Sequence, residues 1–259
     1  ETLDLGNSFN IADNAALYEL PRLKRLRISD GWQAGCFIPD VTLLPALEEL
    51  ECGAETLPQL ARCRKLKKLK LFLSHFDSKT DFSGLSRLSE LEELALNVES
   101  ASQNTEKLYA FRELPKLRKV TFSCGQGTLP LHAFPVLTEL TVLGETTEMG
   151  GGSSELRILA ATGEDAPALE RLSVFAFGAV HFEGYRSTAL RELCLGGCGI
   201  DSLTFTEAFP NLELLNISDN RVEDIAPLTA LPKLCYLCYT DNVIRNIGLL
   251  KDRGIVLVE

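Results

Sequence analysis

The stretch from residue 212 to residue 244 reads LELLNISDNRVEDIAPLTALPKLCYLCYTDNVI and contains one pattern twice, beginning at Leu212 and again at Leu234. Each copy starts with a leucine, has apolar residues three and five positions later, and has an asparagine eight positions later, Asn220 or Asn242. Apolar residues at every second position predict a β-strand with one buried face. A fixed spacing between copies predicts stacked repeats that bury a continuous core.

The same pattern extends outward over the rest of the chain. The motif L-x-x-L-x-L, with other apolar residues allowed, occurs ten times, with first leucines Leu23, Leu47, Leu66, Leu91, Leu117, Leu137, Leu169, Leu190, Leu212 and Leu234. The intervals are close to one another in length, apart from a longer one between Leu137 and Leu169. Residues 3–5 and 255–257 add a strand at each end. The 47 leucines of the chain are therefore mainly the buried positions of repeated strands.

The best copies extend the motif to L-x-x-L-x-L-x-x-N/C-x-L, with Cys198 in place of asparagine in the copy that starts at Leu190. On these residues the sequence resembles the leucine-rich repeat family over essentially its whole length, and residues 209–231 resemble the 22-residue internalin-type repeat. In earlier copies Ser74, Glu99 and Glu145 occupy the asparagine position. The resemblance implies an α/β fold, a right-handed solenoid with a curved parallel β-sheet on the concave face and helices or 3₁₀ turns on the convex face. It also implies that the asparagine or cysteine donates hydrogen bonds to buried backbone carbonyls in the turn.

We therefore predict a single leucine-rich repeat domain over residues 1–259, with about 11–12 strands and an irregular repeat at 137–168. In that repeat we predict an inserted loop at Gly150–Gly152 and a helix over 155–162. Ser153 or Ser154 would cap this helix, Glu155 would occupy its first turn and Gly163 would end it. Similar helical stretches are predicted at 13–20, 58–63, 83–88 and 104–113, with tighter 3₁₀ turns near the C-terminus.

Charged residues alternate in sign on the predicted outer face of the strands. We count offsets from the first leucine of each motif. The side chains at offset +2 are Arg25, Glu49, Lys68, Glu93, Lys119, Glu139, Arg171 and Glu192. Such alternation fits parallel, in-register strands, because a register slip would bring like charges together. It also places the strand after Leu169 directly beside the strand after Leu137. The alternative is that the charged face docks a partner electrostatically.

The overall charge of the chain limits the classes of partner that we expect. Asp and Glu number 36 against 26 Lys and Arg, which gives a formal net charge of −10, and no long basic block occurs. This argues against nucleic acid or an anionic membrane as the main partner. No apolar run approaches the length that a transmembrane helix needs.

The sequence predicts no catalytic, metal-binding or cofactor-binding residues and no cofactor. Cys52 and Cys198 occupy buried positions, and the C-x-x-C pair Cys235 and Cys238 lies on a predicted strand, where residues three apart point to opposite faces. His75, His132 and His181 lie in separate repeats and are predicted in surface loops. Unpaired thiols favour a cytoplasmic location, with a secreted or cell-surface location left open if a signal was removed.

Exposed apolar residues on the concave face are the predicted partner-binding site. Aromatic and aliphatic residues bordered by small polar groups are typical of protein interfaces. The eight residues are Phe72, Leu143 and Phe175 at offset +6, Leu214 and Tyr236 at offset +2, and Cys194, Asn216 and Cys238 at offset +4. Acidic residues at the strand exits, Asp219 and Asp241 among them, form either a solvated rim or a binding edge for a basic partner.

We therefore predict a non-catalytic module that binds a protein partner through the concave face. One alternative is the substrate-recognition part of a larger bacterial effector or enzyme whose catalytic domain lies elsewhere in the gene. Another is a cell-surface adhesion or structural array. No cysteine-rich cap precedes the first strand, so we expect an exposed N-terminal core edge unless something covers it. Three explanations stay open: further residues, shielding by the predicted helix 13–20 and a partner, or a dimer through this edge.

Overall fold

The computed structural model describes residues 1–6, 15–28, 39–76, 80–101, 105–124, 126–144, 154–160 and 166–259. The chain divides into two compact units, Glu1–Val120 and Thr121–Glu259, and each is described by itself. The predicted loop at 150–152 lies outside the described residues. In the described part of the chain, no helix has the length and apolar character needed to cross a membrane.

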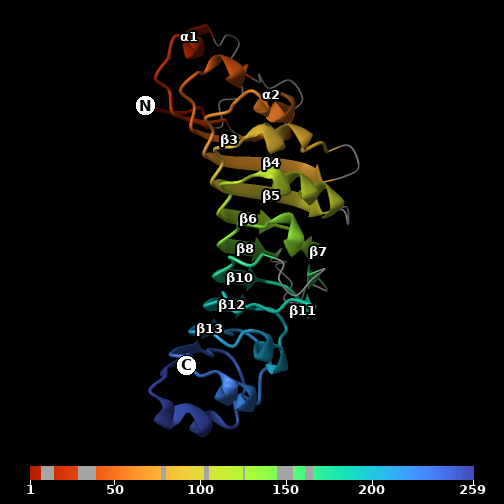
Figure 1. Ribbon diagram of the computed structural model, residues 1–259, viewed down its shortest axis with the longest axis vertical. Coiled ribbons are helices and arrows are strands. Elements are labelled where there is room, and N and C mark those ends of the chain that lie inside the picture. The colour runs from red at the N-terminus through yellow and green to blue at the C-terminus, as the bar shows by residue number, and fades with distance from the viewer. Residues whose placement is uncertain are drawn as a thin grey trace. The chain divides into compact units, whose positions relative to one another are not determined.

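The first unit contains a parallel sheet whose strands follow one another in chain order (Figure 1). Its strands are β1 (Thr2–Asp4), β2 (Arg25–Arg27), β3 (Glu49–Gly53), β4 (Lys68–Phe76) and β5 (Glu93–Ala101). The leucines at offset +3 lie opposite one another in register, from Leu26 to Leu50, Leu69 and Leu94. All four are buried, which confirms that the repeated leucines form the core.

The segments that connect the strands of the first unit contain less α-helix than we predicted. Its elements are α1 (Ala15–Tyr18), the 3₁₀-helices η1 (Val41–Leu43) and η2 (Ala54–Thr56), α2 (Leu57–Leu60), and the 3₁₀-helices η3 (Ser83–Arg87) and η4 (Thr105–Glu113). The α-helices predicted at 83–88 and 104–113 are wrong in type. Leu85 and Leu88 are both buried, and residues three apart share one face of a 3₁₀-helix because its turn spans three positions.

Strand β6 (Lys119–Ser123) spans the boundary between the units. The main sheet of the second unit contains β8 (Glu139–Leu143), β10 (Arg171–Phe175), β12 (Glu192–Gly196), β13 (Leu214–Asn216), β14 (Tyr236–Cys238) and β15 (Val256–Val258). Arg171 lies opposite Glu139, which confirms that the strands after Leu137 and Leu169 are neighbours. The remaining connections include η5 (Leu131–Ala133), η6 (Thr204–Ala208), η7 (Ala226–Ala230) and η8 (Ile247–Arg253).

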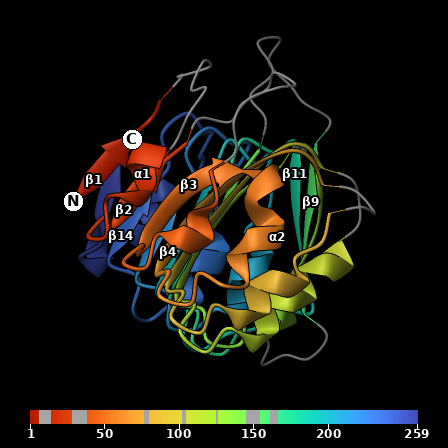
Figure 2. The ribbon, with the colours of Figure 1, turned by 90° about the horizontal axis from the view of Figure 1, so that it is seen from above.

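The helix predicted over 155–162 is wrong, because residues Glu155–Leu159 form strand β9. This strand lies between β7 (Gly127–Pro130) and β11 (Ala179–Glu183) in a second parallel sheet. Within the second unit, this smaller sheet lies on the opposite side of the stacked repeats from the main sheet (Figures 1 and 2). Leu156 and Ile158 are buried whereas Arg157 between them is exposed, an alternation typical of a strand.

The asparagine of each C-terminal turn is bonded as the family resemblance implied. Asn220 Nδ2 donates to the carbonyl oxygens of Leu195, Ile217 and Ser218 at 2.6, 2.8 and 2.9 Å. Asn242 Nδ2 likewise donates to three carbonyls. Cys198 Sγ lies 3.3 Å from the carbonyl oxygen of Val174 and completes the same position one repeat earlier. These side chains supply donors to turn carbonyls that the strands leave open.

Candidate functional site

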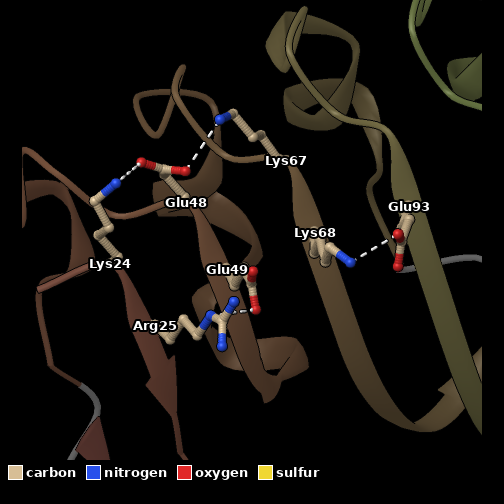
Figure 3. A network of polar contacts seen from close by, with 7 residues as sticks. All are labelled: Lys24, Arg25, Glu48, Glu49, Lys67, Lys68 and Glu93. Atoms are coloured by element: carbon tan, nitrogen blue, oxygen red, sulfur yellow. Dashed lines mark hydrogen bonds and ion pairs between the residues drawn. The ribbon is translucent and has the colours of Figure 1, made fainter. Parts of the chain in front are cut away.

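The charged rows of the first unit are paired across neighbouring strands (Figure 3). At offset +2, Arg25 Nε lies 2.9 Å from Glu49 Oε2, and Lys68 Nζ lies 2.7 Å from Glu93 Oε1. Each pair joins adjacent strands in the register that the sequence predicted. The charges on this face therefore satisfy one another.

In the row at offset +1, ion pairing lowers the pKa of one carboxylate, that of Glu48. Glu48 lies between Lys24 Nζ at 2.8 Å and Lys67 Nζ at 3.0 Å. Hydrogen bonds from these two ammonium groups lower the pKa of Glu48 from 4.5 to about 2. The pKa of Lys67 is raised, chiefly by the same hydrogen bond. A surface whose charges are already neutralised has less electrostatic attraction to offer a partner.

Along the main sheet of the second unit, the side chains at offset +2 change from charged to uncharged. Arg171 forms ion pairs with Glu139 on one side and with Glu192 on the other, the latter at 3.2 Å. The next three residues in register are Leu214, Tyr236 and Val256. Leu214 and Tyr236 are half-buried, and Val256 is 57% exposed. The row thus passes from ion pairs to uncharged apolar and aromatic side chains.

The offset +4 row beside them consists of small or weakly polar residues. Cys194, Asn216 and Cys238 lie opposite one another on β12, β13 and β14, and all three are half-buried. Asn216 Oδ1 accepts a hydrogen bond from the backbone N–H of Ser218 at 2.9 Å. Burial raises the pKa of the Cys194 thiol, which keeps it protonated and uncharged. This row therefore adds a neutral surface to the apolar one.

Phe175 borders this surface on the side of β10. It lies opposite Leu143 on β8 and Gly196 on β12. A Cβ atom placed on Gly196 would lie 2.9 Å from the ring carbon Cδ1 of Phe175, so the ring occupies the space that a side chain would need. Glycine at position 196 therefore allows the ring to lie over the neighbouring strand.

The structure places seven of the eight predicted residues on the main sheet of the second unit: Leu143, Phe175, Cys194, Leu214, Asn216, Tyr236 and Cys238. The eighth, Phe72, belongs to the first unit, where Lys70 Nζ lies 4.8 Å from its ring centroid. Sequence reasoning missed Val256 and Val258, which extend the two rows. The sequence carries a signal for them, because residues 255–257 are a predicted strand and Leu257 lies opposite Leu237, the offset +3 residue of β14.

Two aspartates lie just beyond the exits of β13 and β14. Asp219 and Asp241 are exposed and adopt left-handed backbone conformations, with φ of 56° and 55°. The backbone N–H of Asp219 donates to the carbonyl of Thr240 at 2.9 Å, so the two turns are adjacent. Neither carboxylate forms an ion pair with any residue that the structure describes.

The cysteine and histidine side chains of the described ranges lie on several different elements. Cys52 Sγ lies 2.8 Å from Thr56 Oγ1, and burial raises its pKa to about 12. Among those residues no group of three or more His, Cys, Asp or Glu side chains is placed to hold a metal ion. His181 was predicted in a loop but lies on β11, with Nε2 3.3 Å from a carboxylate oxygen of Glu155. His75 likewise lies within β4, because β4 continues to Phe76.

Comparison with known proteins identifies the repeat. Residues 188–230 match the family model described as leucine rich repeats, in two copies. No protein of curated function matches the sequence significantly.

Solved structures show the same fold over most of the chain. An internalin from Listeria monocytogenes is 15% identical, with a TM-score of 0.52 and coverage of 95% of this chain and 70% of that chain. The leucine-rich repeat domain of APL1B is 16% identical, with a TM-score of 0.58 and coverage of 88% and 66%. A chain of the LRIM1/APL1C complex is 15% identical, with a TM-score of 0.54 and coverage of 85% and 38%. This chain thus spans only part of each of these structures.

Proposed function

From the leucine-rich repeat fold of this chain, we propose that it is a non-catalytic interaction module that binds a protein partner through the main sheet of its second unit. The proposed contact surface, called the neutral face below, consists of Leu214, Tyr236 and Val256 with Cys194, Asn216 and Cys238. Proteins of this fold commonly act as interaction modules, and one similar structure is that of a complex, LRIM1/APL1C.

The change along the offset +2 row carries this proposal. Arg171 is paired with Glu139 on one side and Glu192 on the other. The residues that follow Glu192 in register, Leu214, Tyr236 and Val256, carry no charge. Interface centres are depleted of charge and enriched in aromatic residues, and a few such residues supply most of the binding free energy. Tyrosine also offers a hydroxyl for a hydrogen bond to the partner.

A pair of double variants tests the proposal. Leu214→Ala with Tyr236→Ala removes the centre of the neutral face. Val243→Ala with Leu249→Ala is the matched control, because these side chains are 64% and 49% exposed in the same part of the chain but lie outside the strands. Circular dichroism first establishes that both variants are folded.

The measurement is affinity capture from lysate and from host-cell surfaces, quantified by mass spectrometry. Truncating two interface-centre residues should reduce capture of a specific partner at least about tenfold, because each such residue is worth about 1–2 kcal/mol or more. The control should capture the partner as the unaltered protein does. Equal capture by a folded Leu214→Ala/Tyr236→Ala variant would refute the proposed surface.

A further inference from the structure

We infer that the segment docking on the neutral face carries a lysine or arginine beside an apolar side chain, with the basic group on Asp219 and Asp241. This inference rests on the proposed function and adds the chemistry of the partner. It follows from what borders the neutral face at the exits of β13 and β14.

The two central strands present the same succession of side chains. Along β13 it runs from Leu214 through Asn216 to Asp219, and along β14 from Tyr236 through Cys238 to Asp241. At about 3.3 Å per residue, the five residue steps place the Cα atom of each aspartate within about 17 Å of the Cα atom of the apolar residue of its strand. One short peptide segment can therefore contact an apolar side chain and a carboxylate together.

The two aspartates differ from the carboxylates of the offset +1 and +2 rows, because no described lysine or arginine forms an ion pair with them. Glu48, Glu139 and Glu192 each form an ion pair with a lysine or arginine of a neighbouring repeat. Asp219 and Asp241 occupy adjacent turns and form no ion pair with a described residue. Two negative charges therefore lie in neighbouring turns at the surface. Like charges in adjacent repeats repel each other, and a cation bound between them offsets this repulsion.

The surroundings favour a peptide over other cationic ligands. Calcium needs six to eight oxygen ligands, and in the described part of the chain no third His, Cys, Asp or Glu side chain joins the two aspartates to hold a metal ion. Leu214 and Tyr236 would have no contact with a bare ion. The acidic border would repel nucleic acid phosphates. A protein segment that combines an apolar and a basic side chain satisfies both parts of the surface.

The test uses the full chain and a phage-displayed library of random dodecapeptides selected on the immobilised protein. Asp219→Asn with Asp241→Asn removes the two charges, and asparagine tolerates a left-handed backbone conformation. Glu207→Gln with Asp252→Asn is the matched control, because these exposed residues lie on η6 and η8 and change the net charge equally. Leu214→Ala with Tyr236→Ala reports on the neutral face itself.

We expect the selected peptides to carry Lys or Arg within a few residues of an aromatic or aliphatic side chain. Their affinity should fall about tenfold for Asp219→Asn/Asp241→Asn and stay within about twofold for Glu207→Gln/Asp252→Asn. It should also fall as salt increases.

The outcomes separate this inference from the proposed function. Peptides that lose affinity for Leu214→Ala/Tyr236→Ala but bind Asp219→Asn/Asp241→Asn normally would overturn the inference and leave the neutral face as the binding site. If selection yields no peptide that depends on Leu214 and Tyr236, both the inference and the proposed function are wrong.

Discussion

The buried side chain of Asn220 is expected to contribute strongly to the stability of the second unit. Its amide accepts from the backbone N–H groups of Cys198 and Ile200 at 3.0 and 2.9 Å and donates to three carbonyls. Asn220→Ala removes all five hydrogen bonds in a buried turn. Two of the carbonyls keep a second donor: that of Ile217 accepts from Asn242 Nδ2 at 2.7 Å, and that of Ser218 from the backbone N–H of Gly197 at 3.0 Å. At about 1 kcal/mol for each of the three other partners, we expect a loss of about 3 kcal/mol.

Urea denaturation followed by far-UV circular dichroism measures this loss as a shift of the midpoint at constant slope. Asn216→Ala is the matched control from the same repeat, because Asn216 is half-buried and accepts one hydrogen bond, from Ser218. We expect the control to lose about 1 kcal/mol or less. Equal losses for the two variants would refute the reasoning that the Asn220 amide holds the turn.

Three further predictions concern backbone conformation and charge. Ala176 has φ of 63°, so Ala176→Gly should raise the free energy of unfolding by about 0.5–1 kcal/mol in the same urea assay, and no gain would contradict the strain. A Cβ on Gly144 would lie 2.1 Å from the Ala176 carbonyl oxygen, so Gly144→Ala should lower the thermal midpoint, and an unchanged midpoint would contradict this packing. The lowered pKa of Glu48 means that its ionised form stabilises the fold above pH about 4.5 and that this contribution is lost as pH falls through about 2. The stability difference between the unaltered protein and Glu48→Gln should therefore shrink from pH 5 to pH 2, and Lys24→Met with Lys67→Met should abolish this trend.

The strands and their register could be predicted because both follow from periodic signals. Leucines at offset +3 repeat from Leu26 onward, and the alternation of charges fixes which strands are neighbours across the long interval between Leu137 and Leu169. Most of the candidate surface followed from the same numbering, since offsets +2 and +4 alternate with buried positions. Val256 was missed because the last strand lacks the upstream leucine from which the offsets are counted.

The segment 155–159 shows where such reasoning fails. Ser154 and Glu155 resemble a helix start, and this local signal led to the helix prediction. The pairing partners of Leu156 and Ile158 are Val180 and Phe182 on one side and β7 on the other, and both lie far away along the chain. Strand pairing depends on such distant neighbours, so tertiary context overrode the local preference.

The neutral face is compatible with a fixed register because hydrogen bonds inside the turns also join the repeats there. In the first unit, charges at offsets +1 and +2 join neighbouring strands. In the C-terminal repeats, Asn220 and Asn242 reach back to the preceding repeat, to the carbonyls of Leu195 and Ile217 respectively. These bonds lie inside the turns, so they hold the repeats in line without placing charge on the outer face. The asparagines therefore allow uncharged residues to align at offset +2, and a slipped register would disperse the very side chains proposed to bind the partner.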